Sequence, residues 1–138
     1  MTDAVIDASA FGPLIVPDEA SELIPGMMDI LRDGNVVAPE HWPLEIANLM
    51  RMSVRRGRLT KDSLPSLVAM LRATDVDIDR DTVRHAWGRT LDYAATHDLT
   101  AYDAAYLELA ARTRRVLITN DDALIRAAIA ENLEVLSR

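Results

Sequence analysis

The chain has 138 residues, 49% of them hydrophobic, so it can bury one core and is expected to fold as a single domain over residues 1–138. It has no cysteine, which excludes disulfide scaffolds and thiolate zinc sites. The formal net charge of -7 argues against a broad basic surface for nucleic acid. Because no apolar run reaches the roughly 18 residues of a membrane span and the first residues are acidic, we expect a cytoplasmic protein without a membrane segment.

Short apolar runs alternate with helical patterns along the chain, which is typical of an α/β domain. Apolar residues at helical spacing, such as Leu64, Leu67 and Leu71, mark the helices. In chain order we expect a strand over 4–6, a helix over 18–32, a strand over 36–38, a helix over 40–56, a helix opening near Thr60 as its N-cap, a short strand over 75–79, helices over 81–96 and 101–112, a strand over 116–119, a helix over 122–132 and a strand over 134–136.

The segment 75–79 has the pattern D-x-D-x-D, which also begins calcium-binding loops. Such a loop needs glycine at its sixth position and glutamate at its twelfth, whereas this chain has Arg80 and Ala86 there. We therefore expect a short edge strand that turns Val76 and Ile78 inward and its acids toward water.

Two acids lie at the carboxyl ends of expected strands. Asp7 follows the apolar run 4–6, and Asp121 comes two residues after the run 116–119. Ligands of open parallel sheets bind at that edge. Each acid also has a local explanation, an Asx-turn for Asp7 and a helix N-cap for Asp121. The adjacent Asp122 fits the first helical turn, so Asp121 is the preferred site residue.

A third acid, Glu45, lies on an expected apolar helix face. At 100° per residue it falls within about 60° of Trp42, Leu49 and Met52, so its carboxylate needs a partner. The alternative is a position at the edge of that face, with access to water or to an arginine such as Arg56.

A fourth acid, Asp103, shares a helix face with Tyr106 and Leu107. It also falls three residues after Thr100, where an acid in the first helical turn is stabilising without any further function. Capping alone would account for Asp103 if it were considered singly.

One cause explains the joint placement of these four acids. Carboxylate oxygens are suitable ligands for Mg²⁺ or Mn²⁺, so a divalent-metal site is the leading hypothesis. Without metal the carboxylates would repel one another, and the site is expected to be destabilised or partly protonated. The hydroxyls of Ser9 and Thr119 could orient a carboxylate or a metal-bound water, although ordinary turn or strand roles fit them equally well.

Basic residues gather near the ends of two expected helices, where they would either contact phosphate or complement the helix dipole. The two groups are Arg51, Arg55, Arg56 and Arg58, and Arg112, Arg114 and Arg115. The histidines His41, His85 and His97 form no H-E-x-x-H pattern and are expected at the surface or beside a partner group.

Four segments in this order resemble the PIN domain, specifically VapC-type toxins. They are VIDASA (5–10), PLEIANLMR (43–51), LTAYDAAYLELA (99–110) and ITNDDAL (118–124). By this resemblance, Asp7, Glu45, Asp103 and Asp121 take the places of the family's metal-binding acids. Thr119 takes that of its strand-end hydroxyl, and Asp122 is an extra acid beside the motif.

The resemblance implies a three-layer α/β/α sandwich with a mainly parallel sheet. It also implies an endoribonuclease that uses one or two Mg²⁺ or Mn²⁺ ions to hydrolyse RNA, and a homodimer that acts as the toxin of a type II toxin-antitoxin system. A cognate antitoxin protein would inhibit it, often by placing an arginine in the acidic cleft.

Other functions fit the sequence less well. Receiver and haloacid-dehalogenase domains need a late lysine, but Lys61 is the only lysine, and the sequence contains no P-loop motif. The remaining alternative is a non-catalytic, metal-stabilised binding module that captures a basic antitoxin-like peptide.

Overall fold

The computed structural model describes residues 2–138 and contains one sheet of five parallel strands in the order β3-β2-β1-β4-β5. The strands are β1 (Asp3–Ile6), β2 (Asn35–Ala38), β3 (Val76–Ile78), β4 (Val116–Ile118) and β5 (Val135–Leu136). In the central strand, Val5 is in register with Val37 on one side and with Leu117 on the other. Because all the strands run in one direction, their carboxyl ends emerge at the same edge of the sheet.

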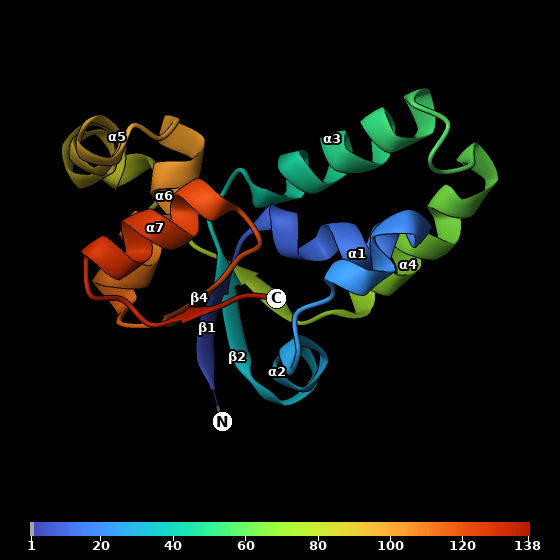
Figure 1. The fold of residues 1–138 in the computed structure, drawn as a ribbon, viewed down its shortest axis with the longest axis horizontal. Coiled ribbons are helices and arrows are strands. Elements are labelled where there is room, and N and C mark those ends of the chain that lie inside the picture. The colour runs from blue at the N-terminus through green and yellow to red at the C-terminus, as the bar shows by residue number, and fades with distance from the viewer. Residues whose placement is uncertain (1) are drawn as a thin grey trace.

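Helices cover both faces of this sheet, which confirms the three-layer α/β/α arrangement (Figure 1). The helices are α1 (Gly12–Ile15), α2 (Met27–Asp33), α3 (Trp42–Arg55), α4 (Leu64–Ala73), α5 (Leu91–His97), α6 (Ala101–Thr113) and α7 (Asp122–Ala130). Figure 1 places α5, α6 and α7 on one side of the sheet and α1 to α4 on the other. Shorter turns of other helix types are η1 (Ala8–Phe11), η2 (Pro17–Glu22), η3 (Lys61–Ser63), η4 (Val83–His85) and the π-helical η5 (Ala86–Thr90).

The core is centred on β1 and α6. Residues 4–6 of β1 are fully buried, as expected for a strand covered on both faces. In α6 every residue from 104 to 110 is buried, because its alanines allow the helix to approach β1 and β4 closely. On the opposite face, Phe11 packs edge-on against Trp42 with their ring centroids 5.2 Å apart. These contacts fix α3 and α6 against the edge of the sheet where the acids lie.

Two expected helices are interrupted. The helix expected over 18–32 is wrong as one element, because η2 ends at Glu22 and α2 begins only at Met27. Pro25 disfavours helical geometry in the residue before it, and Gly26 has a left-handed φ of 84°. The helix expected over 81–96 is divided into η4, η5 and α5, and Gly88 within η5 has a non-helical ψ of -113°.

The short strand β3 is an edge strand, as expected, with Val76 packed against the core and Asp75 and Asp77 exposed, but two side chains are placed differently. Ile78 is exposed rather than turned inward. Asp79 does not face water, because Arg112 donates to its Oδ2 over 2.7 Å. Thr60 precedes the short turn η3 rather than α4 itself and makes no capping hydrogen bond through its side chain. Within residues 2–138, no helix is long and apolar enough to cross a membrane.

Candidate active site

Asp7 is the first residue beyond β1 and is only 4% exposed. Its Oδ2 accepts hydrogen bonds from the hydroxyls of Ser9, at 2.6 Å, and Thr119, at 2.8 Å. Burial raises the pKa of Asp7 to about 6, although these two hydrogen bonds oppose the shift. The negative charges of Asp103 and Glu45 raise the pKa further. Asp7 is therefore a buried carboxyl that faces other acids, and the hydrogen bonds to its side chain come from hydroxyls rather than from the backbone N–H of the alternative Asx-turn.

The same two hydroxyls connect the loops that follow β1 and β4. Thr119 accepts a hydrogen bond from the backbone N–H of Asp121 at 3.0 Å, and Ser9 accepts one from the backbone N–H of Asn120 at 3.0 Å. Each hydroxyl thus donates to Asp7 and accepts from the β4 loop. This pairing fixes the Asp7 carboxylate relative to Asp121, although the two residues are far apart in the sequence.

Glu45 lies in the first turn of α3 and is held by two neighbouring side chains. The hydroxyl of Tyr106 donates to its Oε1 over 2.5 Å, and Nε2 of His41 lies 3.3 Å from the same oxygen. Burial acts to raise the pKa of Glu45, but the hydrogen bonds from His41 and Tyr106 together hold it below its usual value. The suggested pairing with Arg56 is wrong, because these two groups occupy that role.

Tyr106 remains a hydrogen-bond donor over the whole physiological pH range. Burial raises the pKa of its hydroxyl well above the usual value, and the charges of Asp7 and Glu45 raise it further. The imidazole of His41 is packed against the rings of Tyr106 and Tyr102, with centroid distances of 5.3 and 5.5 Å. Glu45 therefore has a rigid polar support at the start of α3.

Asp103 lies in the first turn of α6, and the helix cap is Thr100, whose Oγ1 accepts the N–H of Asp103 at 3.1 Å. Burial raises the pKa of Asp103, and the negative charges of Asp121 and Glu45 add to that effect. The first-turn explanation is thus correct for the backbone of Asp103, while its carboxylate faces the other acids.

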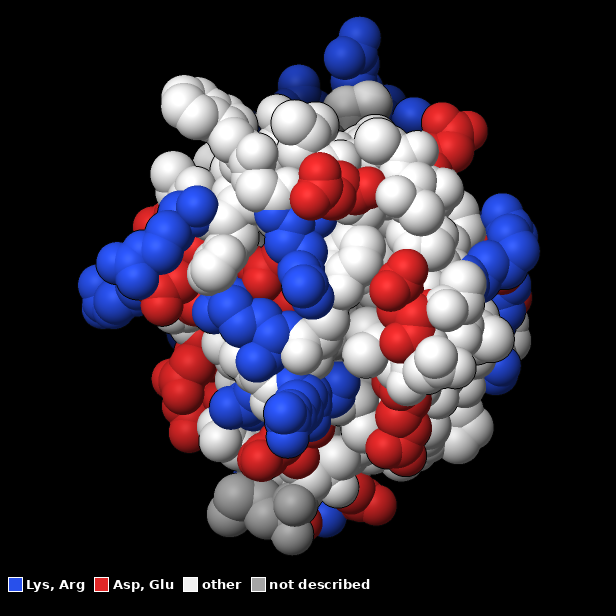
Figure 2. All heavy atoms as spheres, turned by 90° about the vertical axis from the view of Figure 1, so that its left-hand side faces the viewer, with Lys and Arg blue, Asp and Glu red and all other residues white. Residues whose placement is uncertain are grey.

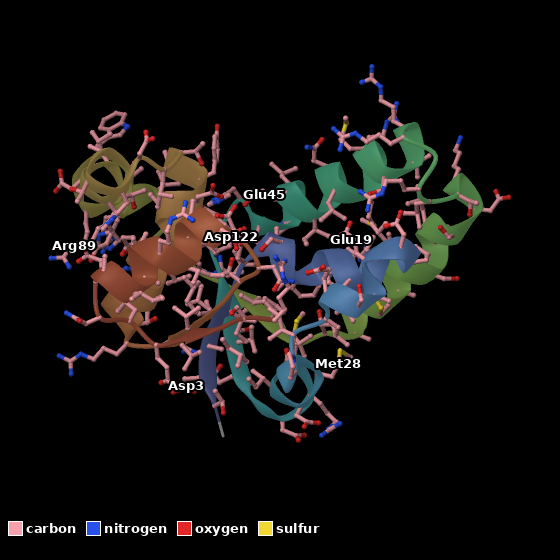
Figure 3. All side chains as sticks on the ribbon, viewed as in Figure 1. Asp3, Glu19, Met28, Glu45, Arg89 and Asp122 are labelled. Carbon is pink, nitrogen blue, oxygen red and sulfur yellow. The ribbon has the colours of Figure 1, made fainter. Side chains whose placement is uncertain are left out.

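Asp121 caps α7, because its Oδ1 accepts the N–H of Leu124 at 2.9 Å. The N-cap alternative therefore describes one oxygen of Asp121, and its charge still acts on Asp103. The neighbouring Asp122 is exposed on the first turn of α7. Figure 3 shows Glu45 at the start of α3 and Asp122 at the start of α7.

The four acids carry negative charge that basic side chains do not neutralise. Within residues 2–138 the ion pairs of Asp7, Glu45, Asp103 and Asp121 include no lysine or arginine, and His41 is the single basic partner. A cleft of about 440 Å³ lies beside Glu45 and Asp103. This donor set is chemically suitable for a divalent cation. In the described part of the chain, however, no three such side chains already converge in a geometry that could hold a metal ion.

Two of the arginines considered for phosphate contact are used inside the protein. Arg58 pairs with Asp18 at 2.6 Å, and Arg112 pairs with Glu108 and Asp79, each at 2.7 Å. Arg114 and Arg115 immediately precede β4, so they lie at the amino edge of the sheet, opposite the acids. On the face that carries α5 and α7, basic side chains are interspersed with acids (Figure 2). This face is therefore not uniformly basic.

Comparison with known proteins decides the family. The family model described as PIN domain matches residues 4–130. This chain belongs to the PIN-domain family. The matched range contains all four acids and the strands β1 to β4.

Two individual proteins resemble this PIN-domain chain. The protein named Ribonuclease VapC3 from Pyrobaculum aerophilum is 30% identical over 121 residues, which cover 85% of this chain and 88% of that protein. The crystal structure of PAE2754 from Pyrobaculum aerophilum superimposes with a TM-score of 0.66 at 21% identity. That alignment covers 91% of this chain and 84% of the other and supports the fold.

Two residues that contact the candidate acids were not predicted as site residues. His41 was expected only at the surface or beside a partner group, and Tyr106 only as a neighbour of Asp103 on a helix face. A signal for His41 is its position four residues before Glu45, which places both on one side of the helix. For Tyr106 the signal is a hydroxyl on an otherwise apolar face, because a buried hydroxyl requires an acceptor.

Proposed function

We propose that this PIN-domain protein is a Mg²⁺- or Mn²⁺-dependent endoribonuclease. The observation that carries this proposal is the buried Asp7 at the carboxyl edge of the sheet, next to Glu45 and Asp103 and without a lysine or arginine partner among residues 2–138. Natural proteins retain such unfavourable charge chiefly at functional sites. The name of the Pyrobaculum aerophilum relative supports RNA as the substrate.

Asp7, Glu45, Asp103 and Asp121 would hold one or two cations. A bound divalent cation polarises the scissile phosphate and lowers the pKa of a bound water. Ser9 and Thr119 both bind Oδ2 of Asp7, and within residues 2–138 no hydrogen bond ends on its Oδ1, so that oxygen is available as a ligand. Tyr106 and His41 orient Glu45 in the same way, and such supporting groups commonly increase metal affinity.

The biological role that we propose is that of the toxin in a type II toxin-antitoxin system of the cytoplasm. The cognate antitoxin would block the acidic cleft, for which an arginine side chain is a suitable ligand because guanidinium binds carboxylates through paired hydrogen bonds. We further propose that the active form is a homodimer, as in VapC-type toxins.

Incubation of the purified protein with structured RNA tests the proposed activity. We expect cleavage in Mg²⁺ or Mn²⁺ that leaves 5′-phosphate and 3′-hydroxyl ends, and we expect EDTA to abolish it. Glu45→Gln should lose most of the activity, while the matched change Glu134→Gln, at an exposed site on the opposite edge of the sheet, should not.

Two results would contradict the proposal. Cleavage that persists in EDTA, or in Glu45→Gln at the wild-type rate, would show that the acids are not the catalytic centre. Failure to cleave any RNA, together with tight binding of a basic peptide in the cleft, would instead support the binding module.

A further inference from the structure

A second cavity adjoins the acidic cleft. It has a volume of about 380 Å³ and lies between the start of α3, the turns η4 and η5, and the start of α6. His41, Leu44 and Tyr102 line both this cavity and the acidic cleft, so the two spaces lie on either side of these residues. Most of its other lining is apolar and includes Val83 and Ala86. A ligand that extends from the acids across His41 or Tyr102 would enter this cavity.

An unpaired hydroxyl lies at this cavity. Thr90 lines it and is only 3% exposed, yet its Oγ1 has no hydrogen-bond partner among residues 2–138. Buried hydroxyls in folded proteins nearly always have a partner, so Thr90 leaves an unsatisfied hydrogen-bonding group at the wall of this cavity. Glu40 and Thr82 add further polar groups at the cavity wall.

The charge of the cavity excludes a phosphate as its occupant. The lining contains the carboxylate of Glu40 but no lysine or arginine. The single basic group of the lining, His41, is already paired with Glu45, so a phosphate would meet the Glu40 carboxylate without a free cationic partner, which is unfavourable. A flat, largely apolar ligand with N–H donors and hydrogen-bond acceptors fits the lining, and a nucleobase has these properties.

Tyr102 provides a surface on which a base can stack. Its side chain is 65% exposed at the boundary between the cavity and the acidic cleft. The ring meets His41 at an interplanar angle of 66°, which fixes its orientation while leaving most of its surface open. Single-stranded RNA is commonly recognised by bases that stack on such aromatic rings.

We propose that this cavity binds one nucleobase of a single-stranded RNA, next to the bond cleaved at the acids. The base stacks on Tyr102, and its polar edge reaches the Thr90 hydroxyl and the Glu40 carboxylate. This inference rests on the proposed ribonuclease function, because the acids place the phosphate and the cavity places the adjoining base.

The test compares a short single-stranded RNA with two versions that lack the base on one or the other side of the cleaved bond. For the wild-type protein, one of the two abasic RNAs should lower kcat/KM by about 5- to 150-fold, the range that base stacking on an aromatic side chain supplies. Tyr102→Ala, and Ala86→Leu, which fills the cavity, should lower kcat/KM by a similar factor for the complete RNA. For the abasic RNA that the wild-type protein cleaves more slowly, Tyr102→Ala and Ala86→Leu should not lower kcat/KM any further.

Three further variants separate the specific contacts from general damage. Tyr102→Phe keeps the ring and should retain activity. Thr90→Val keeps the shape but removes the hydroxyl and should lose part of the discrimination between complete and abasic RNA. Trp87→Ala, which removes a 93% exposed aromatic side chain outside the cavity lining, should have no effect.

The outcomes distinguish this inference from the proposed function. If the protein cleaves RNA but treats complete and abasic RNAs alike, the base site is wrong, the ribonuclease proposal stands, and the cavity is left to a side chain of a protein partner. If the protein does not cleave, binding of the same RNAs in Mg²⁺ is measured by fluorescence anisotropy. Tighter binding of the complete RNA than of the abasic RNA, lost in Tyr102→Ala, would support the base site without the ribonuclease function. Equal affinity for the two RNAs, or no binding of either, would overturn the base site.

Discussion

Replacement of Asp7 by asparagine is expected to lower kcat/KM for RNA cleavage by about three orders of magnitude and to stabilise the metal-free protein at pH 7. The loss of activity follows because a catalytic cation contributes several kcal/mol and Asp7 is its most buried proposed ligand. The gain in stability follows because asparagine keeps an acceptor for Ser9 and Thr119 but removes the buried charge. Opposite effects on activity and stability are typical of functional residues.

The sign of the pH dependence follows from the raised pKa of Asp7. In the folded protein Asp7 binds a proton up to about pH 6, whereas the unfolded chain releases it near the ordinary value of 3.8. Between these values the folded state binds more protons, so the free energy of unfolding of the wild-type protein falls as the pH rises. Relative to Asp7→Asn, this loss should reach about 1–3 kcal/mol at pH 7 and nearly vanish at pH 4.

Urea unfolding in EDTA at pH 4 and pH 7 measures this difference. Asp3→Asn, at the exposed start of the same strand, is the matched control and should show little pH-dependent gain. If Asp7→Asn is no more stable than the wild-type protein at pH 7, the buried charge of Asp7 does not lower the free energy of unfolding. If Asp7→Asn still cleaves RNA, Asp7 is not required for catalysis.

Replacement of Arg112 by methionine is expected to lower the free energy of unfolding by about 3–5 kcal/mol. Arg112 donates to Glu108, which is only 2% exposed, and to Asp79 beyond the end of β3. These hydrogen bonds raise the pKa of Arg112 far above its usual value. Without the guanidinium, Glu108 would remain as an unpaired buried charge, and the link between α6 and the edge strand would be lost.

The free energy of unfolding of Arg112→Met is measured by urea titration at pH 7. Arg126→Met, on the exposed face of α7, removes an arginine without an ion pair among residues 2–138 and should change stability by less than about 0.5 kcal/mol. Adding Glu108→Leu to Arg112→Met should recover much of the loss, because the buried charge is then absent. A loss below about 1 kcal/mol in Arg112→Met would mean that the pair behaves like a surface ion pair.

The strands and the continuous helices could be predicted because their patterns depend on burial. The apolar runs 4–6 and 116–119 are covered on both faces, and the helix over 101–112 contains no glycine or proline that would interrupt it. The interrupted helices could not be predicted from apolar spacing alone. The helices are interrupted at Pro25, Gly26 and Gly88, although the spacing of apolar residues continues across these positions.

Part of the candidate site could also be predicted, because it depends on the pattern of buried strands. The edge of a parallel sheet determines where Asp7 and Asp121 lie, since both follow strands of one direction. The partners of Glu45 could not be predicted, because the hydroxyl of Tyr106 is 61 residues away and reaches it only because the fold brings the start of α3 beside α6. Likewise, the ion pair of Arg112 with Asp79 spans 33 residues and depends on the position of β3.

Crystals of the wild-type protein grown in Mn²⁺ test the central claim most directly. We expect an anomalous difference peak at the carboxyl edge of the sheet, with oxygens of Asp7 and Glu45 within coordination distance of the ion. Asp7→Asn crystals grown in the same way should lack the peak. Manganese bound only elsewhere, or at the same position in both proteins without contact to Asp7 or Glu45, would contradict a catalytic metal site built from these acids.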